Sequence, residues 1–217
     1  MKTVIFTGGS IDKETVIEQM ERIRPDAVIA ADHGLGFCDS CGIVPDYIVG
    51  DFDSLDHRVI DRYRAEGKVP IDTFQPEKDM TDTDIALEKA IAIGSTEVFF
   101  FGATGTRLDH TISNIFNLYK LYDRGIQGWI IDRYNRISMP LGNRVVLKKA
   151  EVYGGNISMF PLRGELRGVT LHGFKYPLTD AVLVQGDGGL SVSNAVVEEE
   201  AEIIWQAGIL ILMETRD

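Results

Sequence analysis

The chain has 217 residues, enough for one large domain or two small ones, and its 44% hydrophobic and 25% charged residues are typical of a folded globular protein. No apolar run approaches the roughly 18 residues needed to cross a bilayer, and the formal net charge of −11 argues against a nucleic-acid surface. We therefore exclude a membrane protein and a disordered chain, and we predict no nucleic-acid partner. The first apolar residues reach Gly8-Gly9 too soon to hold a secretory segment, which predicts a cytoplasmic protein.

The negative charge is concentrated in one part of the chain. Residues 26–84 contain 12 Asp, 2 Glu and 5 Lys or Arg, so about a quarter of the chain carries nearly all of the net charge. Aspartate outnumbers glutamate there, and its short side chain suits loops and rigid metal sites better than exposed helix faces. A solvated acidic face is the alternative interpretation.

The first part of the chain alternates between strand-like and helix-like segments. Ser10 can cap a first helix whose apolar residues recur at helical spacing up to Pro25. Continuous apolar runs are typical of strands buried on both faces of a parallel sheet. The predicted strands are 4–6, 27–31, 47–49, 98–101 and 128–131, and the later predicted helices are 35–41, 55–64, 83–93 and 111–122. This alternation predicts a doubly wound parallel α/β domain over residues 1–134.

After residue 134 the helical period disappears. Short alternating segments separated by glycines predict an all-β sandwich domain over residues 135–217. The predicted strands are 144–147, 156–160, 166–170, 181–184, 202–205 and 209–213.

The two cysteines, Cys38 and Cys41, form a C-x-x-C motif near the end of a short helical stretch. Tetrahedral zinc needs four ligands and no second pair exists, while a redox motif normally opens a helix directly after a strand. We therefore interpret both as packing thiols. Three histidines, His33, His57 and His172, are expected to be surface or packing residues.

Four polar clusters follow predicted strands or precede a predicted helix. They are residues 32–34, 50–54, 78–82 and 102–110. In an open α/β sheet, ligands bind beyond the carboxyl ends of the strands, so these clusters are expected to converge. Helix capping explains one such cluster but not four. Converging carboxylates repel one another unless a cation neutralises them, and hard oxygen ligands select Mg²⁺ together with substrate phosphates.

The same clusters indicate how a nucleotide could bind. Lys78 and Arg107 supply positive charge, and Gly102 and Gly105 let backbone amides approach phosphate oxygens. The sequence thus predicts an acidic cleft that can hold Mg²⁺ together with a polyanion such as ATP. Gly8-Gly9 provides a weaker signal of the same kind.

In order along the chain, these clusters resemble the motifs of the thiamine pyrophosphokinase family. The matching segments are Ala31-Asp32-x-Gly34, Pro45-Asp46, Gly50-Asp51-Phe52-Asp53-Ser54, Lys78-Asp79-x-Thr81-Asp82, Gly102-x-x-Gly105-x-Arg107-x-Asp109-His110 and Ser191-Val192-Ser193-Asn194. The resemblance implies an α/β nucleotide-binding domain followed by a β-sandwich thiamine-binding domain. It also implies a homodimer with active sites at the subunit interface, and transfer of pyrophosphate from ATP to the hydroxyl of thiamine, giving thiamine diphosphate and AMP.

The resemblance also implies roles for particular residues. Asp51, Asp53 and Asp82 would hold Mg²⁺, with Asp79 and Asp32 nearby, and Arg107 and Asp109 would orient the phosphates and the reacting groups. The implied nucleotide contacts are Asp32, Lys78, Thr81, Gly102, Gly105, Arg107 and His110, and the implied thiamine contacts are Ser191, Ser193 and Asn194. Asp109 or an uncoordinated oxygen of Asp53 or Asp79 could accept the hydroxyl proton.

Other interpretations stay open on the sequence alone. A related pyrophosphokinase could act on a pterin alcohol. An aspartate-dependent phosphohydrolase would use Asp51 as nucleophile and Asp53 as acid and base. A nucleotide sensor without catalysis is the third alternative.

Overall fold

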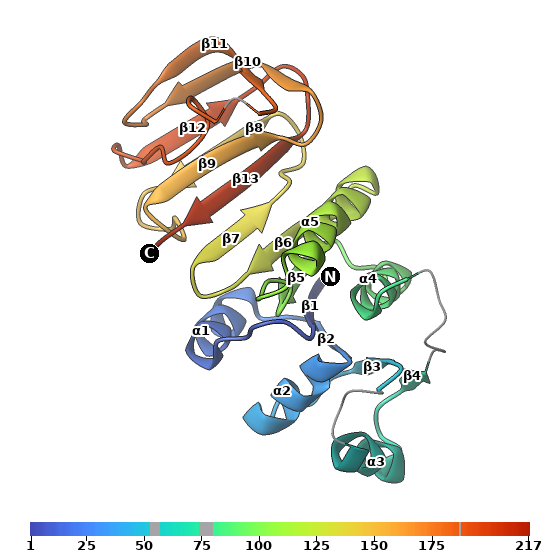
Figure 1. The fold of residues 1–217 in the computed structure, drawn as a ribbon. Coiled ribbons are helices and arrows are strands. Elements are labelled where there is room, and N and C mark those ends of the chain that lie inside the picture. Colours follow the sequence, from blue (N-terminus) through green and yellow to red (C-terminus); the bar gives the residue numbers. More distant parts are fainter. Residues whose placement is uncertain (53–56, 74–79, 187) are drawn as a thin grey trace. The chain divides into compact units, whose positions relative to one another are not determined.

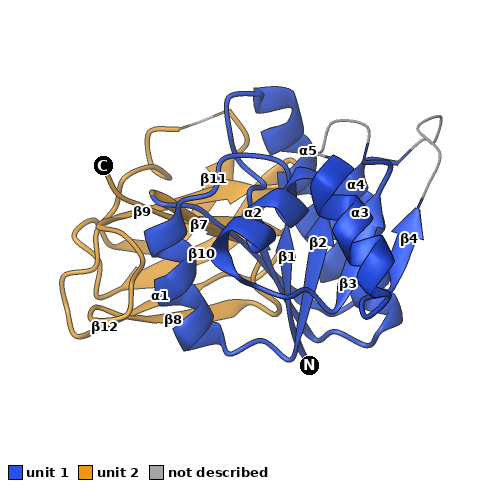
Figure 2. Ribbon diagram, turned by 90° about the horizontal axis from the view of Figure 1, so that it is seen from below, with its two compact units in different colours: residues 1–133 blue, residues 134–217 orange. Residues whose placement is uncertain are grey.

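The computed structural model describes residues 1–52, 57–73, 80–186 and 188–217. The chain forms two compact units, residues 1–133 and residues 134–217, which Figure 2 shows in different colours. None of the helices described is long and apolar enough to cross a membrane.

Unit 1 is built on a parallel sheet with the strand order β4-β3-β2-β1-β5-β6. All five residues of β2 are buried, as are the last four of β1 and of β5, because helices cover both faces of the sheet. The strands are β1 (Lys2–Phe6), β2 (Ala27–Ala31), β3 (Tyr47–Gly50), β4 (Ile71–Thr73), β5 (Glu97–Phe101) and β6 (Gln127–Ile131).

Five helices connect these strands. In Figure 1, α1, α2 and α3 lie on one side of the sheet and α4 and α5 on the other, as right-handed crossovers require for this strand order. Contacts between α2 and α3 and between α4 and α5 agree with this division. The helices are α1 (Lys13–Ile23), α2 (His33–Cys41), α3 (His57–Glu66), α4 (Asp82–Ala92) and α5 (Leu108–Asp123).

The predicted starts of three helices were wrong: α2 begins at His33, two residues before its predicted start, and α1 and α5 also differ. Asp12, not Ser10, caps α1: its carboxylate accepts hydrogen bonds from the amide and the hydroxyl of Thr15, at 2.9 and 2.7 Å. A carboxylate at the N-terminus also interacts favourably with the helix dipole. Helix α5 begins at Leu108, three residues before the predicted start, so Asp109 and His110 lie in its first turn rather than in a loop.

Unit 2 contains two antiparallel groups of strands, ordered β7-β13-β9 and β11-β10-β12-β8. Side chains from both groups form one buried cluster that includes Met159, Leu171, Ile203, Trp205 and Leu212. This is the packing of a β-sandwich. The strands are β7 (Asn135–Ser138), β8 (Arg144–Lys148), β9 (Asn156–Pro161), β10 (Glu165–His172), β11 (Leu178–Val184), β12 (Glu200–Ile204) and β13 (Leu210–Thr215).

The predicted fold class, a parallel α/β unit followed by an all-β unit, is confirmed. Two strands, β4 and β7, were not predicted.

Candidate active site

The strand order of unit 1 reverses between β1 and β5, because β2 follows β1 on one side while β5 and β6 lie on the other. Ligands of open α/β sheets bind at such a reversal, beyond the carboxyl ends of the strands. A pocket of about 590 Å³ lies there. Its lining comes from the segments at and after the ends of β1, β2 and β5, from the first turn of α4 and from the first two turns of α5: Thr7, Gly8, Gly9, Ser10, Ala31, Asp32, His33, Thr81, Asp82, Thr83, Gly102, Ala103, Thr104, Gly105, Thr106, Arg107, His110, Thr111 and Asn114.

The segments after β1 and β5 are bound to each other through their backbones. The amide of Gly9 donates to the carbonyl of Gly102 at 2.7 Å, and the amide of Ser10 donates to the carbonyl of Thr104 at 2.8 Å. A Cβ on Gly9 would lie 2.2 Å from the Gly102 oxygen, so only glycine permits this approach. The close contact explains the second glycine of the Gly8-Gly9 motif.

Asp32 lies at the carboxyl end of β2 and lines the pocket. Its φ of 44° is rare for a residue other than glycine, and such strain concentrates at functional sites. Its carboxylate lies 2.7 Å from Nδ1 of His33. His33 also lines the pocket, a placement that the sequence analysis did not assign to it.

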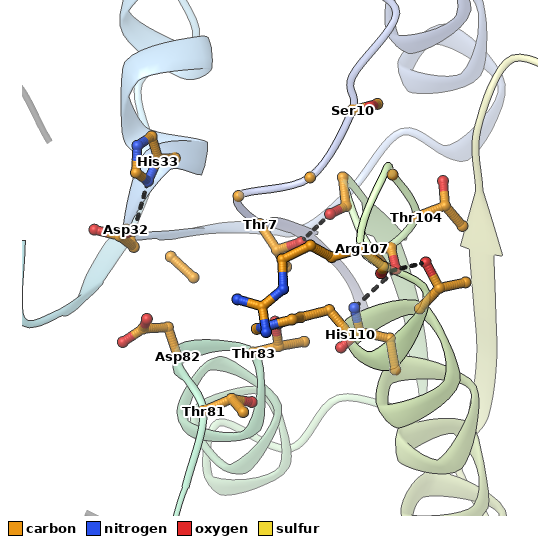
Figure 3. Close-up of a pocket in the computed structure, with 18 of the residues that line it drawn as sticks. Thr7, Ser10, Asp32, His33, Thr81, Asp82, Thr83, Thr104, Arg107 and His110 are labelled. Carbon is orange, nitrogen blue, oxygen red and sulfur yellow. Dashed lines mark hydrogen bonds and ion pairs between the residues drawn. The ribbon is translucent and has the colours of Figure 1, made fainter. Parts of the chain in front are cut away.

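Asp82 opens α4 on the same side of the pocket as Asp32 (Figure 3). Burial, followed by the negative charges of Asp32 and Asp51, raises the pKa of Asp82 to about 6. Two predicted site carboxylates, Asp32 and Asp51, are thus close enough to Asp82 to disfavour its ionised form. The described residues contain no group of three or more His, Cys, Asp or Glu arranged to hold a metal ion, and the predicted ligand Asp53 lies outside them.

The start of α4 is held by a capping box. The Thr81 hydroxyl accepts from the Asp84 amide at 3.2 Å, and the Asp84 carboxylate accepts from the Thr81 amide at 3.0 Å. Lys120 of α5 donates to the other carboxylate oxygen of Asp84 at 2.5 Å. Burial alone would raise the pKa of Asp84, but these hydrogen bonds outweigh it and lower the pKa. The network orients the first turn of α4, which carries Asp82.

Arg107 and His110 lie on the opposite side of the pocket from Asp32 (Figure 3). The Arg107 guanidinium makes two hydrogen bonds with Asp109, from Nε at 3.2 Å and from Nη2 at 2.6 Å. The hydrogen bond from Arg107 is the main cause that lowers the pKa of Asp109 to about 2. Asp109 in this arrangement is therefore a weak proton acceptor, and it orients Arg107.

The third group of predicted residues lies in unit 2. Ser193 is exposed with a φ of 59°, and its amide donates to the hydroxyl of Ser158 at 3.1 Å. The side chain of Asn194 is buried and bonds the backbone of Tyr176 in both directions, at 3.1 and 2.8 Å. Ser191 is also buried. Asn194 therefore holds the segment in shape, and Ser193 is the member of the three that is open to a ligand.

The pocket brings together seven of the predicted residues: Asp32, Thr81, Asp82, Gly102, Gly105, Arg107 and His110. Asp51 and Asp109 are not part of its lining, and the predicted residues Asp53, Lys78 and Asp79 lie outside the described residues. Thr7 and Asn114 were not predicted, and Thr104 was predicted only as part of the cluster 102–110 without a role of its own. Thr7 and Thr104 adjoin glycine motifs that could have indicated them, whereas Asn114 follows no strand and carries no such signal.

Comparison with known proteins gives concordant results for both units. Residues 23–130 match the family description "Thiamin pyrophosphokinase, catalytic domain", and residues 143–210 match "Thiamin pyrophosphokinase, vitamin B1 binding domain". The chain is 34% identical to thiamine pyrophosphokinase of Bacillus subtilis over 190 residues, which is 87% of each chain. It is 26% identical to thiamine pyrophosphokinase 2 of Arabidopsis thaliana over 76% of this chain and 66% of that one.

Solved structures agree. The crystal structure of thiamine pyrophosphokinase from Bacillus subtilis superimposes with a TM-score of 0.87 at 30% identity and covers 100% of both chains. That of thiamin pyrophosphokinase from Geobacillus thermodenitrificans gives 0.83 at 28% identity, covering 100% of this chain and 98% of that one. The pterin, phosphohydrolase and sensor alternatives are not favoured by any of these matches. The resemblance inferred from the motifs is thus confirmed, and the chain belongs to the thiamine pyrophosphokinase family.

Proposed function

We propose that this enzyme transfers the pyrophosphoryl group of ATP to the hydroxyl of thiamine, giving thiamine diphosphate and AMP. The observation that carries the proposal is the pocket at the β1/β5 reversal, which places carboxylates on one side and Arg107 with His110 on the other. Unit 1 would bind the nucleotide and unit 2 would bind thiamine.

The triphosphate would lie against the segment after β5. Arg107 supplies positive charge at the start of α5, and Gly102 and Gly105 keep side chains away from the backbone amides. Lys78 is the second predicted cation. Asp32, Thr81 and His110 complete the proposed nucleotide contacts.

Mg²⁺ fits the donor set of this site. Burial, followed by the negative charges of Asp32 and Asp51, raises the pKa of Asp82, and a bound divalent cation would stabilise its ionised form against both effects. Asp51 and Asp82, with Asp53, would hold the ion, and Asp32 and Asp79 would lie near it. When bound, Mg²⁺ would neutralise phosphate charge and align the oxygens of the triphosphate.

In the proposed reaction, the thiamine hydroxyl oxygen forms a bond to the β-phosphorus while the bond from that phosphorus to the oxygen of AMP breaks. AMP leaves with the electron pair, and a carboxylate takes the hydroxyl proton. Arg107, held by Asp109, would stabilise the charge that moves onto the phosphate oxygens. The low pKa of Asp109 favours Asp53 or Asp79 as the proton acceptor.

We also propose that the enzyme is a homodimer whose active sites lie at the subunit interface. Arg107 and Asp109 are 69% and 65% exposed, so in one isolated chain this side of the nucleotide pocket faces solvent. Ser193 is exposed as well, as expected for a residue that meets a ligand or a second chain. Ser191 and Asn194 would shape the thiamine pocket around it.

The central experiment incubates the protein with ATP, MgCl₂ and thiamine and separates the nucleotides by chromatography. We expect AMP and thiamine diphosphate in equal amounts, and no AMP when thiamine is omitted or EDTA is in excess. Formation of ADP or free phosphate in place of AMP would reject pyrophosphoryl transfer.

Complementation tests the dimer. The variants Arg107→Ala and Ser193→Trp, each inactive alone, should regain activity when mixed if one site takes residues from two chains. A monomer in sedimentation at assay concentration, or no recovery on mixing, would contradict the proposed shared site.

A further inference from the structure

Three consecutive carbonyls in the segment after β5 are held by hydrogen bonds. The Gly102 carbonyl accepts from the Gly9 amide at 2.7 Å and from the Thr7 hydroxyl at 2.6 Å. The Thr104 carbonyl accepts from the Ser10 amide at 2.8 Å. Between them, the Ala103 carbonyl accepts from Nδ2 of Asn114 at 2.8 Å. The middle carbonyl is therefore held by a side chain, whereas both of its neighbours are held by the backbone of the segment after β1.

Asn114 is well placed to act through this bond. It lies in the second turn of α5 and is only 8% exposed, and it lines the same pocket as Arg107 and His110. A buried amide that donates to a buried carbonyl resists displacement, because breaking the bond leaves two polar groups unsatisfied.

Fixing the Ala103 carbonyl also fixes the amide of the next residue. The described residues contain no cis peptide bond, so the Thr104 N–H points opposite to the Ala103 carbonyl and hence away from Asn114. Within the described parts of the chain, no hydrogen bond uses the Thr104 amide as a donor. Thr104 lines the pocket, and its hydroxyl donates to Asp132 at 2.7 Å, which fixes the residue from a third direction.

We propose that Asn114 is a positioning residue for the nucleotide: by holding the Ala103 carbonyl, it presents the Thr104 amide to a phosphate oxygen of ATP. The energetic advantage is preorganisation, since the donor is oriented before the anion arrives. The inference rests on the nucleotide site of the proposed function but not on the identity of the acceptor substrate.

The test measures binding of a non-hydrolysable ATP analogue with Mg²⁺ by calorimetry. Asn114→Leu removes the donor at similar volume, and Asn114→Asp replaces it with a group that repels the carbonyl. Loss of one hydrogen bond to a charged group should raise Kd about tenfold or more. Asn117→Leu is the matched control: Asn117 is also a buried asparagine of α5, 2% exposed, and its Nδ2 has no partner among the described residues.

Two further readouts separate positioning from a general structural role. In ¹H–¹⁵N spectra, the analogue should shift the Thr104 amide resonance strongly in the wild type and weakly in Asn114→Leu. In the full reaction, the KM for ATP should rise while the KM for thiamine stays within a factor of two. Asn114→Ser keeps a hydroxyl donor on a shorter side chain, so its affinity for the analogue should lie between those of Asn114→Leu and the wild type. If Asn114→Leu does not fold, the comparison of Asn114→Ser with the wild type still tests the inference.

Unchanged analogue affinity in a folded Asn114→Leu or Asn114→Ser protein would overturn the inference, as would an equal loss in Asn117→Leu. Failure of the proposed function can be distinguished from failure of this inference. If the wild type binds the analogue but forms no AMP, the proposed reaction is refuted and the role of Asn114 in nucleotide binding is not.

Discussion

Glu214 in unit 2 is a buried carboxylate and Asp82 in unit 1 is a half-buried one, and their surroundings differ. Arg136 binds both oxygens of Glu214, at 2.7 and 2.6 Å, and the amide of Tyr153 adds a third hydrogen bond at 3.0 Å. Asp82 forms no ion pair with a basic side chain in the described part of the chain, and burial and neighbouring carboxylates raise its pKa to about 6.

The two carboxylates thus differ in whether the folded chain itself supplies a basic partner for their charge. Unit 2 neutralises its buried carboxylate with its own residues, so the charge is satisfied in the folded chain without any ligand. In unit 1, Lys120 binds Asp84 in the same way, whereas Asp82 lies near the carboxylates of Asp32 and Asp51, and we propose that a ligand relieves this repulsion. Unfavourable electrostatics of this kind are typical of binding and catalytic sites.

Asp82→Asn should have the largest effect on activity. An amide removes the charge on which the proposed Mg²⁺ site depends, so we expect turnover to fall about 10³-fold with the fold retained in circular dichroism. Asp61→Asn, at an exposed aspartate of α3, is the matched control and should keep wild-type turnover. Turnover within threefold of the wild type in Asp82→Asn would end the assignment of this carboxylate to the site.

Arg136→Met should have the largest effect on stability. The substitution leaves Glu214, whose side chain is 5% exposed, as an unpaired buried charge, which costs about 3 kcal/mol. The double variant Arg136→Met/Glu214→Leu should recover most of this loss, although the Tyr153 amide then lacks its acceptor.

The two tryptophans allow this loss to be assigned to unit 2. Trp129 lies in β6 and Trp205 lies in the core of unit 2, so urea unfolding in a Trp129→Phe background reports on unit 2 through Trp205. A destabilisation below about 1 kcal/mol for Arg136→Met would show that the pair is no more than a surface ion pair.

The same Asp82→Asn change should stabilise the metal-free protein at neutral pH. A raised pKa means that the folded state binds the proton more tightly than the unfolded state, so ionised Asp82 destabilises the fold above about pH 6. The variant should therefore gain about 1 kcal/mol at pH 8, after allowance for the partial exposure of the group.

This gain should shrink as the pH falls from 6 towards the ordinary aspartate pKa of 3.8, so it should be much smaller at pH 4, where the folded state is protonated, than at pH 8. Urea unfolding in EDTA at the two pH values measures it. A gain that is the same at pH 4 and pH 8 would assign the effect to packing rather than to charge.

The sequence predicted the parts of unit 1 that are buried most uniformly. The five apolar residues of β2 and the apolar run of β5 carry the burial pattern of inner parallel strands in their composition alone. The site was predictable for the same reason, because its polar clusters stand directly after those strands or at the start of α4. The three-residue edge strand β4 and the strand β7 have only one aliphatic residue each, Ile71 and Ile137, and so leave no pattern to detect.

Other features depend on backbone geometry that composition does not encode. The start of α5 was missed because Leu108 is 71% exposed and follows a glycine-rich segment that is typical of a loop. Asn114 was missed because its partner is a carbonyl eleven residues away, which any residue type at position 103 would supply. The repulsion at Asp82 likewise arises only when β2, β3 and α4 come together.

The smallest effect is expected at the cysteines of α2, which show that burial in unit 1 does not by itself imply function. Burial, with a smaller contribution from Cys41, raises the pKa of Cys38 to about 12, so its thiolate is absent at neutral pH. Iodoacetamide should therefore label Cys41 alone in the native protein and both residues in urea, as mass spectrometry would show. Cys41 lies eight residues beyond His33, about 12 Å along the helix from the pocket, so labelled enzyme should keep its full rate. Cys41→Ser should abolish labelling of the native protein and leave the activity unchanged. A large loss of rate on labelling would instead indicate that the C-x-x-C motif contributes to the active site.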